Sequence, residues 1–251
     1  MKSVQRVRVL GAPVDAVDMA GALGFVENRI RGRQSQPSSC VVAINPEKAF
    51  AARKNPELHT CLEDAALVIP DGIGVVLAAR LLHRVPIRRV AGADLMQEIC
   101  RRAAEKGYRL FLYGASEEVN RSAVAELRRR FPDISIVGRQ HGFLPPDAMD
   151  KLLDEIDQSQ ADILFVALGS PRQENWMKCY APRLNTPVCM GIGGTLDTLV
   201  GHVKRAPRIW QRLGLEWLYR LISQPSRAKR QIVLPLFVWL VVRDILRTAR
   251  T

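Results

Sequence analysis

The fold is constrained most by a regular alternation between short β-branched or aliphatic runs and longer segments with helical periodicity. The sequence predicts strands at residues 4–10, 40–44, 66–69, 109–114, 134–138, 163–169 and 187–192. Helices are expected near residues 16–31, 72–83, 94–106, 117–131, 147–158 and 171–182. Strands that are apolar on both faces and separated by helices form mostly parallel sheets covered on both sides. The sequence therefore predicts an α/β, Rossmann-like fold.

The chain divides in two at about Thr195, where the predicted strands stop and a basic, helical pattern begins. We expect a Rossmann-like catalytic domain over residues 1–195 and a basic, amphipathic helical appendage over residues 196–251. Of the formal net charge of +12, residues 201–251 contribute +9, from 11 Lys and Arg against 2 Asp and Glu. A basic segment beside a nearly neutral domain indicates an anionic partner: phosphate groups, a membrane surface or nucleic acid.

Cysteine, histidine and apolar patterns exclude several classes of protein. The five cysteines form no Cys-x-x-Cys pair and the four histidines are scattered, which argues against a disulfide framework or a zinc site. Residues 1–30 lack the continuous apolar core of a signal peptide. The longest apolar run, residues 232–242, contains Pro235 and is much shorter than the roughly 20 residues of a membrane-spanning helix. The sequence favours a cytosolic protein with reduced thiols.

Polar residues follow several of the predicted strands. Asn45, Asp71 and Gln173 each lie shortly after the end of one. In open parallel sheets ligands bind beyond the carboxyl ends of the strands, so we expect these side chains to converge on one edge. Asp71 stands between Pro70 and Gly72, and an Asp-Gly pair also suits a turn with positive φ at the glycine. The residues alone leave both interpretations of Asp71 open.

The segment GIGGTLD, residues 191–197, places three glycines at the start of a predicted helix. Backbone N–H groups of Gly193, Gly194 and Thr195 could cradle a phosphate there, helped by the helix dipole. A tight turn with Thr195 as the helix N-cap explains the same residues equally well.

The segment LGSPRQENW, residues 168–176, indicates the start of a helix, with Ser170 as N-cap and Pro171 in the first turn. Gln173 closes a capping box with Ser170 in one interpretation. In the other it reaches forward to a sugar hydroxyl or a uracil edge.

Arg88 and Arg89 precede another predicted helix, for which Asp94 is a candidate cap. They are either a pair of solvated arginines or include one that points into a cleft for an anionic ligand, because guanidinium binds phosphate oxygens bidentately.

Residues 202–231 combine an apolar stripe with many arginines. The stripe has near-helical spacing and consists of Trp210, Leu213, Trp217 and Leu221. A basic amphipathic helix with tryptophans is typical of docking at a membrane interface, and packing onto the domain is the alternative. Nucleic acid is not favoured as a partner, because no helix-turn-helix, RRM or zinc-finger pattern accompanies the charge.

The sequence contains no Asp-x-Asp motif, which many glycosyltransferases use to hold a metal-bridged nucleotide diphosphate. We therefore expect no metal site and no cofactor. Arginines and backbone N–H groups would take up the charge of any departing diphosphate.

Taken together, these segments resemble the WecG/TagA/CpsF family of bacterial glycosyltransferases. The resemblance extends over nearly the whole chain and rests on AINPEK, PDGIGVVLAARL, RVAGADL, FLYGASEE, HGFL, VALGSPRQE and a long block from Gly191 to Arg227. It implies a Rossmann-like enzyme that transfers a hexose from a UDP-sugar to a polyprenyl-diphosphate-linked sugar in cell-surface polysaccharide synthesis. The transfer would proceed with inversion and without metal.

The resemblance also implies roles for individual residues. It makes Asp71 the general base that takes the proton from the acceptor hydroxyl. It makes three further residues substrate-binding, namely Asn45, Arg89 and Gln173. Appendage arginines that would reach the diphosphate match Arg220, Arg227 and Arg230. Ala43 replaces a threonine that many members carry, which leans the donor toward an N-acetylmannosamine or N-acetylmannosaminuronic acid type of sugar.

The implied location is cytoplasmic and peripheral, at the inner face of the bacterial plasma membrane, where an anionic lipid surface would be a partner. A membrane-tethered nucleotide-binding module without catalysis is the alternative function, and it would not need Asp71. The oligomeric state stays open, a homo-oligomer being one option.

Overall fold

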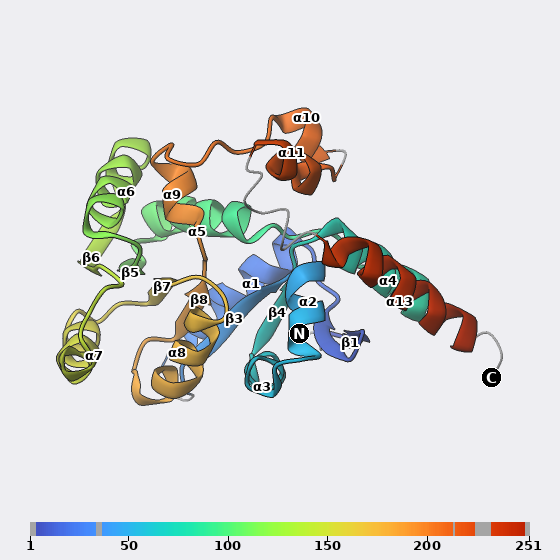
Figure 1. Cartoon of the computed structure of the whole chain (residues 1–251). Coiled ribbons are helices and arrows are strands. Elements are labelled where there is room, and N and C mark those ends of the chain that lie inside the picture. Colours follow the sequence, from blue (N-terminus) through green and yellow to red (C-terminus); the bar gives the residue numbers. More distant parts are fainter. Residues whose placement is uncertain (1–3, 34–36, 213, 224–231, 249–251) are drawn as a thin grey trace.

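A computed structural model describes residues 4–33, 37–212, 214–223 and 232–248 (Figure 1). Six parallel strands form the main sheet in the order β4-β3-β8-β7-β5-β6. Their bounds are β3 Ser39–Ile44, β4 Leu67–Pro70, β5 Arg109–Gly114, β6 Ser135–Gln140, β7 Ile163–Ala167 and β8 Val188–Gly191. The predicted α/β, Rossmann-like fold with a mostly parallel sheet is confirmed.

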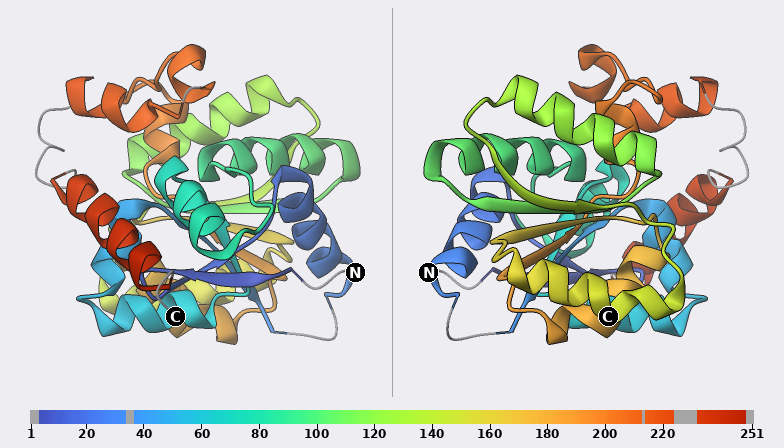
Figure 2. Two further views of the ribbon diagram at one scale, coloured as in Figure 1. Left: turned by 90° about the vertical axis from the view of Figure 1, so that its right-hand side faces the viewer. Right: turned by 90° about the vertical axis from the view of Figure 1, so that its left-hand side faces the viewer.

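Helices cover both faces of this sheet (Figure 2). The helices α1 Met19–Arg31, α5 Gly92–Lys106, α6 Glu117–Arg130 and α9 Thr195–Leu199 contribute to one hydrophobic cluster. The cluster on the other side takes residues from α2 Pro46–Ala52, α3 Pro56–Asp64, α4 Ile73–His83, α7 Met149–Gln158 and α8 Arg172–Tyr180. Strand β7 divides its residues between them, with Leu164 and Val166 in one cluster and Ile163 and Phe165 in the other. This alternation explains why the central strands are apolar throughout.

The strand predicted at residues 4–10 is present but shorter, and it lies outside the main sheet. Strand β1, Arg6–Val9, pairs antiparallel with β2, Ala12–Asp15, in a separate two-stranded sheet. Leu10 and Gly11 between them both have positive φ, as a tight hairpin requires. The buried Asp15 carboxylate accepts hydrogen bonds from Arg6 and from the Val68 backbone N–H, which fastens the hairpin to β4.

Two short helices between β3 and β4 were not predicted from the sequence. Both α2 and α3 begin at the proline of an Asn-Pro-Glu triplet, with Asn45 and Asn55 as N-caps. The cap side chains accept hydrogen bonds from Lys48 N and Leu58 N. The repeated triplet was a usable signal, because asparagine favours the N-cap and proline the first helical position.

After α9 the chain continues with α10 Arg208–Arg212, α11 Glu216–Ser223 and α13 Val233–Thr248, and two short 3₁₀ turns lie earlier at Pro146–Ala148 and Ala181–Arg183. The single amphipathic helix expected to carry Trp210, Trp217 and Leu221 is interrupted, because Gly214 adopts φ +72° between α10 and α11. Leu213 of the same stripe lies outside the described residues. Among the described residues, no helix is both long and apolar enough to cross a bilayer.

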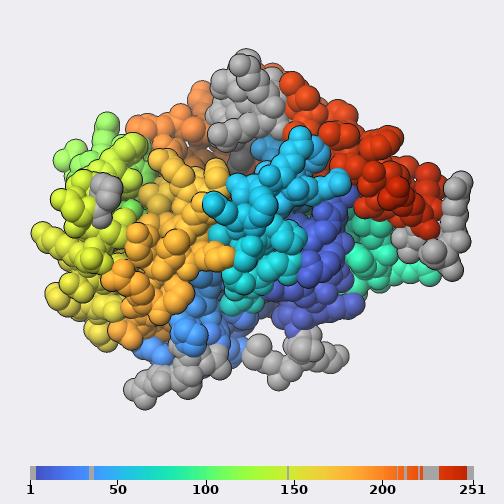
Figure 3. Space-filling model, turned by 60° about the horizontal axis from the view of Figure 1, so that its bottom comes forward, coloured from blue at the N-terminus to red at the C-terminus, as the bar shows by residue number. Residues whose placement is uncertain are grey.

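Helix α13 packs against α2 and α4, and it buries Phe237, Leu240 and Val241 in the same cluster as those helices. In Figure 3 the cyan surface of α2 and α3 lies between the amber surface of α8 and the red surface of α13. The last described helix is therefore part of the folded body. Where the catalytic domain ends, which the sequence puts at residue 195, stays a prediction.

Candidate active site

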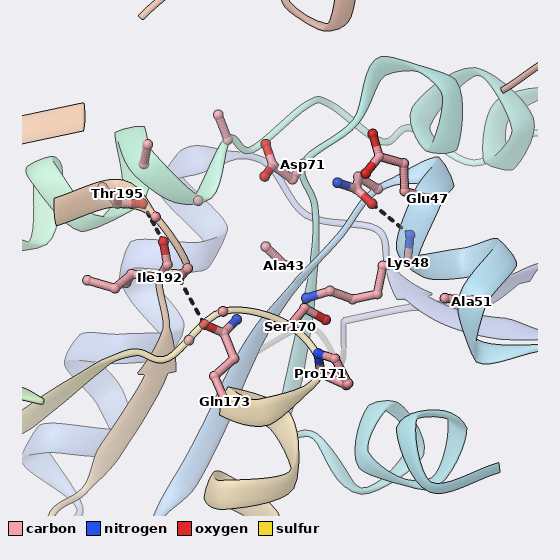
Figure 4. Close-up of a pocket in the computed structure, with 18 of the residues that line it drawn as sticks. Ala43, Glu47, Lys48, Ala51, Asp71, Ser170, Pro171, Gln173, Ile192 and Thr195 are labelled. Carbon is pink, nitrogen blue, oxygen red and sulfur yellow. Dashed lines mark hydrogen bonds between the residues drawn. The ribbon is translucent and has the colours of Figure 1, made fainter. Parts of the chain in front are cut away.

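A pocket of about 800 Å³ opens at the carboxyl edge of the sheet (Figure 4). Its lining brings together seven of the residues predicted from the sequence: Asn45, Asp71, Arg89, Gln173, Gly193, Gly194 and Thr195. They come from the segments that follow β3, β4, β7 and β8, with Gln173 in the first turn of α8 and Thr195 at the start of α9, and from the segment before α5. The predicted convergence on one sheet edge therefore holds for these side chains.

Asp71 follows β4 directly, and its backbone N–H donates to the Ile44 carbonyl of the neighbouring strand at 2.9 Å. The glycine after it does not form a left-handed turn: Gly72 has φ −88° and is the N-cap of α4. A Cβ on Gly72 would lie 2.5 Å from Pro46 Cδ, so glycine is needed for close packing between the two loops. The positive-φ turn interpretation of Asp71 is therefore wrong. Its carboxylate is one-third exposed and lines the pocket.

Arg88 and Arg89 have different surroundings. Arg88 is exposed, whereas Arg89 is turned inward with 22% of its side chain exposed. Arg89 donates from Nε to the Asp71 carbonyl at 2.7 Å and from one terminal nitrogen to Glu216 at 2.7 Å. The same terminal nitrogen lies 4.0 Å from the Asp71 carboxylate. Arg89 thus joins the backbone of Asp71 to helix α11.

Two expected helix caps are wrong near the pocket. Helix α5 begins at Gly92 with Ala91 as its N-cap, and Asp94 instead forms an ion pair with Arg205. Helix α9 has Gly194 at its N-cap, and the Thr195 hydroxyl donates to the Ile192 carbonyl.

The capping interpretation of Ser170 and Gln173 is also wrong. Helix α8 begins at Arg172 with Pro171 as its N-cap, after a cis Ser170–Pro171 peptide bond. Gln173 is buried, and its Oε1 accepts the backbone N–H of Gly193 at 2.9 Å (Figure 4). Gly193 has positive φ, and its N–H is held by Gln173. The Thr195 N–H donates to the Ile192 carbonyl at 3.2 Å, so two of the three N–H groups expected to cradle a phosphate already have acceptors within the protein.

An ion pair that the sequence analysis did not anticipate lies under this turn. Lys48 Nζ donates to Glu174 Oε1 at 2.6 Å, and Gln173 Nε2 donates to the same oxygen at 2.9 Å. Burial alone would raise the Glu174 pKa. The charge of Lys48 and hydrogen bonds from Lys48, Gln173 and Ser170 outweigh burial, so the pKa lies below its usual value. Glu174 is therefore ionised at neutral pH.

A model of the WecG/TagA/CpsF family of glycosyl transferases matches residues 7–251. The chain belongs to this family. It is therefore a glycosyltransferase of cell-surface polysaccharide synthesis, which uses a nucleotide-sugar donor and a sugar acceptor.

Three predicted site residues of this glycosyltransferase cannot be placed with the others. Arg220 is on α11, but its side chain is not among the described ones, and Arg227 and Arg230 lie outside the described residues. Their roles stay predictions, as do the individual roles of the residues that line the pocket.

The pocket of the glycosyltransferase also contains residues that sequence reasoning missed. Glu216 is buried. It is one of only two acidic residues after Gly201, and its rarity in this basic segment was a sequence signal that it has a specific partner. Lys48 lies within the quoted AINPEK motif but was not singled out. Within the described part of the chain, no three His, Cys, Asp or Glu side chains are grouped as they would be to hold a metal ion.

Proposed function

We propose that this glycosyltransferase is an inverting, metal-independent enzyme. It moves an N-acetylmannosamine-type sugar, an N-acetylmannosaminuronic acid or another hexose from a UDP-sugar to a polyprenyl-diphosphate-linked sugar. The main support is the position of Asp71, a partly exposed carboxylate at the end of β4, in a pocket that it shares with the Gly193 turn. A base beside a turn that we propose contacts the donor diphosphate is the arrangement that this transfer requires.

In the proposed reaction, the Asp71 carboxylate takes the proton of the acceptor hydroxyl. The acceptor oxygen attacks the anomeric carbon from the face opposite the diphosphate. A new C–O bond forms as the bond from the anomeric carbon to the diphosphate oxygen breaks, and UDP leaves with the electron pair. The configuration at the anomeric carbon is inverted.

The charge balance of the pocket supports a role for the appendage arginines. Among the described residues that line it, the cations are Lys48, Arg89 and Arg205. Each is already paired with a carboxylate, of Glu174, Glu216 and Asp94 respectively. A departing diphosphate therefore needs further positive charge, and Arg220, Arg227 and Arg230 are the proposed source.

Membrane docking is part of the same proposal. Opposite the residues that it buries, α13 exposes a second set of apolar side chains: Leu236, Val238, Trp239, Val242 and Leu246. Helix α4, which packs against α13, exposes Leu77 and Leu81. We propose that these residues enter the interface of the inner leaflet, while the basic appendage attracts anionic lipid. Trp210, another expected anchor, is partly covered and packs edge-on against Tyr219.

A donor panel tests the activity. The purified protein is incubated with individual UDP-sugars and a short-chain polyprenyl-diphosphate-linked sugar, and released UDP and lipid product are measured. We expect stoichiometric UDP and product with one donor, an inverted anomeric configuration, and full activity in excess EDTA. Nucleotide binding without any transfer across the panel would favour the non-catalytic module. Loss of activity in EDTA, restored by magnesium or manganese, would contradict the metal-independent mechanism.

A further inference from the structure

The buried pair Lys48–Glu174 connects three loops of the active site from below. The Glu174 side chain is fully buried and that of Lys48 is 10% exposed. Lys48 is in the first turn of α2 after β3, Glu174 is in the first turn of α8 after β7, and Gln173 extends the connection to Gly193 after β8. One chain of hydrogen bonds thus joins three neighbouring strand ends.

The Gly191–Gly194 turn, at the end of this chain of hydrogen bonds, is held in place by its contacts with Gln173. Gly193 has φ +53°, and Gly191 lies so close to Gln173 that a Cβ would be 2.8 Å from Nε2. The Gly193 N–H is held by Gln173 Oε1, and the orientation of that amide is fixed by the bond from Nε2 to Glu174. If Glu174 loses its carboxylate, the amide loses the acceptor that determines which way it points.

Stability alone does not account for a buried ion pair at this place. Removing two charges from water costs free energy that their attraction repays only in part, and a pair of well-packed apolar residues is often as stable. The pair does something that an apolar pair could not, because it gives the Gln173 amide a charged acceptor and so a single orientation.

We propose that Lys48 and Glu174 are positioning residues that hold Gln173, and through it the Gly191–Gly194 turn, in the geometry that receives the diphosphate of the nucleotide. This inference rests on the proposed function, in which that turn contacts the donor. Neither residue is assigned a step in the chemistry, so their loss should weaken nucleotide binding more than it slows the transfer from bound donor.

The test uses the full chain and three variants. Glu174→Gln removes the charge, and Lys48→Met/Glu174→Met replaces the pair with apolar residues of similar length. Lys178→Met is the matched control, because Lys178 is on the same helix and forms an exposed ion pair with Asp64 at 3.3 Å. The three measurements are thermal unfolding, hydrogen exchange of the segment around Gly193, and the dissociation constant of UDP.

We expect the double variant to fold and to unfold at a moderately lower temperature than the unmodified chain, because it contains no unpaired buried charge but leaves the buried Gln173 Nε2 without its acceptor. Its Gly193 segment should nonetheless exchange several-fold faster, and UDP should bind about tenfold more weakly or worse, as expected for one misplaced hydrogen-bonding turn. Glu174→Gln keeps an amide oxygen that can accept from Gln173 but leaves the buried Lys48 charge without a partner, so it should lower stability and weaken UDP binding less than the double variant does. Lys178→Met should change none of the three measurements.

Native exchange and native UDP affinity in a folded double variant would overturn the proposal, since the pair would then serve stability alone. If Glu174→Gln does not fold, the double variant still decides the question. If the unmodified chain binds neither UDP nor UDP-sugars, the proposed function fails, while hydrogen exchange still tests whether the pair holds the turn.

Discussion

Asp71 is held in the pocket by backbone contacts and by close packing. Its N–H is bonded to Ile44, its carbonyl accepts from Arg89, and Gly72 packs directly on Pro46. A carboxylate fixed in this way can face an acceptor hydroxyl without first reorganising, which is the requirement for efficient general-base catalysis.

We predict that Asp71→Asn retains the fold and UDP binding but lowers kcat by about 10² or more, because an amide cannot accept the hydroxyl proton. Steady-state kinetics beside UDP titration would measure this. Glu47→Gln is the matched control, because Glu47 is another carboxylate in the lining of the pocket. Near-native turnover of Asp71→Asn, or a larger loss in Glu47→Gln, would place the base elsewhere.

The reactivity of the cysteine thiols tests the burial of individual residues. Burial raises the pKa of Cys40 and Cys100 to about 12, and it also raises the pKa of Cys61 and Cys189. The thiolate is the reactive form and accumulates only as pH approaches the pKa, so these thiols should be inert near pH 8.

We predict that the native protein reacts quickly with one equivalent of a disulfide reagent at pH 8, at the exposed Cys179. Absorbance of the released thiol measures the stoichiometry. Cys179→Ser should abolish the fast phase, and denaturation should make the remaining four thiols reactive. Fast modification of Cys40 or Cys100 in the folded chain would contradict the burial described here.

Site residues that follow a strand could be predicted from the sequence, and residues that pair across distant segments could not. The convergence of Asn45, Asp71 and Gln173 was predicted because they follow apolar strands, and parallel strands end at a common edge. Their roles in the site came from the family resemblance. The ion pairs Lys48–Glu174 and Arg89–Glu216 were not predicted, since no local pattern in the sequence relates the two members of either pair. Such pairs are visible only once the fold brings distant segments together.

At the level of elements, one contact between α11 and the α/β body is made by a buried acid. Glu216 is 10% exposed and pairs with Arg89, and Gln211 accepts a further, longer hydrogen bond from Arg89 through its backbone carbonyl. Because Arg89 also holds the Asp71 carbonyl, movement of α11 would be transmitted to the proposed base.

We predict that Glu216→Ala weakens the attachment of α10 and α11 by about 1–3 kcal/mol, the usual effect of leaving a partly buried charge without its partner. Trypsin should then cleave faster after Arg205 or Arg208, as measured on gels or by mass spectrometry, and turnover should fall. Arg88→Ala is the matched control, because Arg88 is the exposed neighbour of Arg89. It should change neither the rate of trypsin cleavage nor turnover. Unchanged proteolysis in Glu216→Ala would show that other contacts hold the helices.

The strands and helices of the main parallel sheet were predicted well, including the four-residue strands β4 and β8, whereas the β1–β2 hairpin, α2 and α3 were not. Strands β3, β5 and β7 and helices α5 and α6 have the apolar runs or helical periodicity that define them in sequence. The β1–β2 hairpin, α2 and α3 are only four to nine residues each, too short for a period to be recognised. There the usable sequence signals were single residues: Gly11 in the hairpin turn, and Asn45 and Asn55 as helix caps.

At the scale of the whole molecule, α13 has two apolar faces with different surroundings. Phe237, Leu240 and Val241 are buried against the body, whereas 58% of Trp239 is exposed, with Arg243 stacked over its ring at 5.4 Å. Deleting this helix would uncover α2 and α4, so point substitutions on the exposed face test membrane docking more cleanly than truncation does.

We predict that Trp239→Ser reduces binding to anionic liposomes about tenfold or more without lowering the unfolding temperature, because a large interfacial side chain is lost while the buried face is kept. Co-sedimentation measures the binding, which should also weaken as salt rises. Phe143→Ser is the matched control, since Phe143 is an aromatic residue with 70% exposure after β6. Equal losses in both variants would mean that α13 is not the docking surface.

The separation of Lys48 and Glu174 in the chain, 126 residues, has a consequence for recombination within the family. A chimera joined anywhere between α3 and β7 inherits the two charges from different parents. Where the parents differ in side-chain length or charge at either position, the product would contain a mismatched buried pair next to the Gly191–Gly194 turn. Exchanges intended to alter donor choice should therefore transfer α2 and α8 together, although the two helices are far apart in the gene.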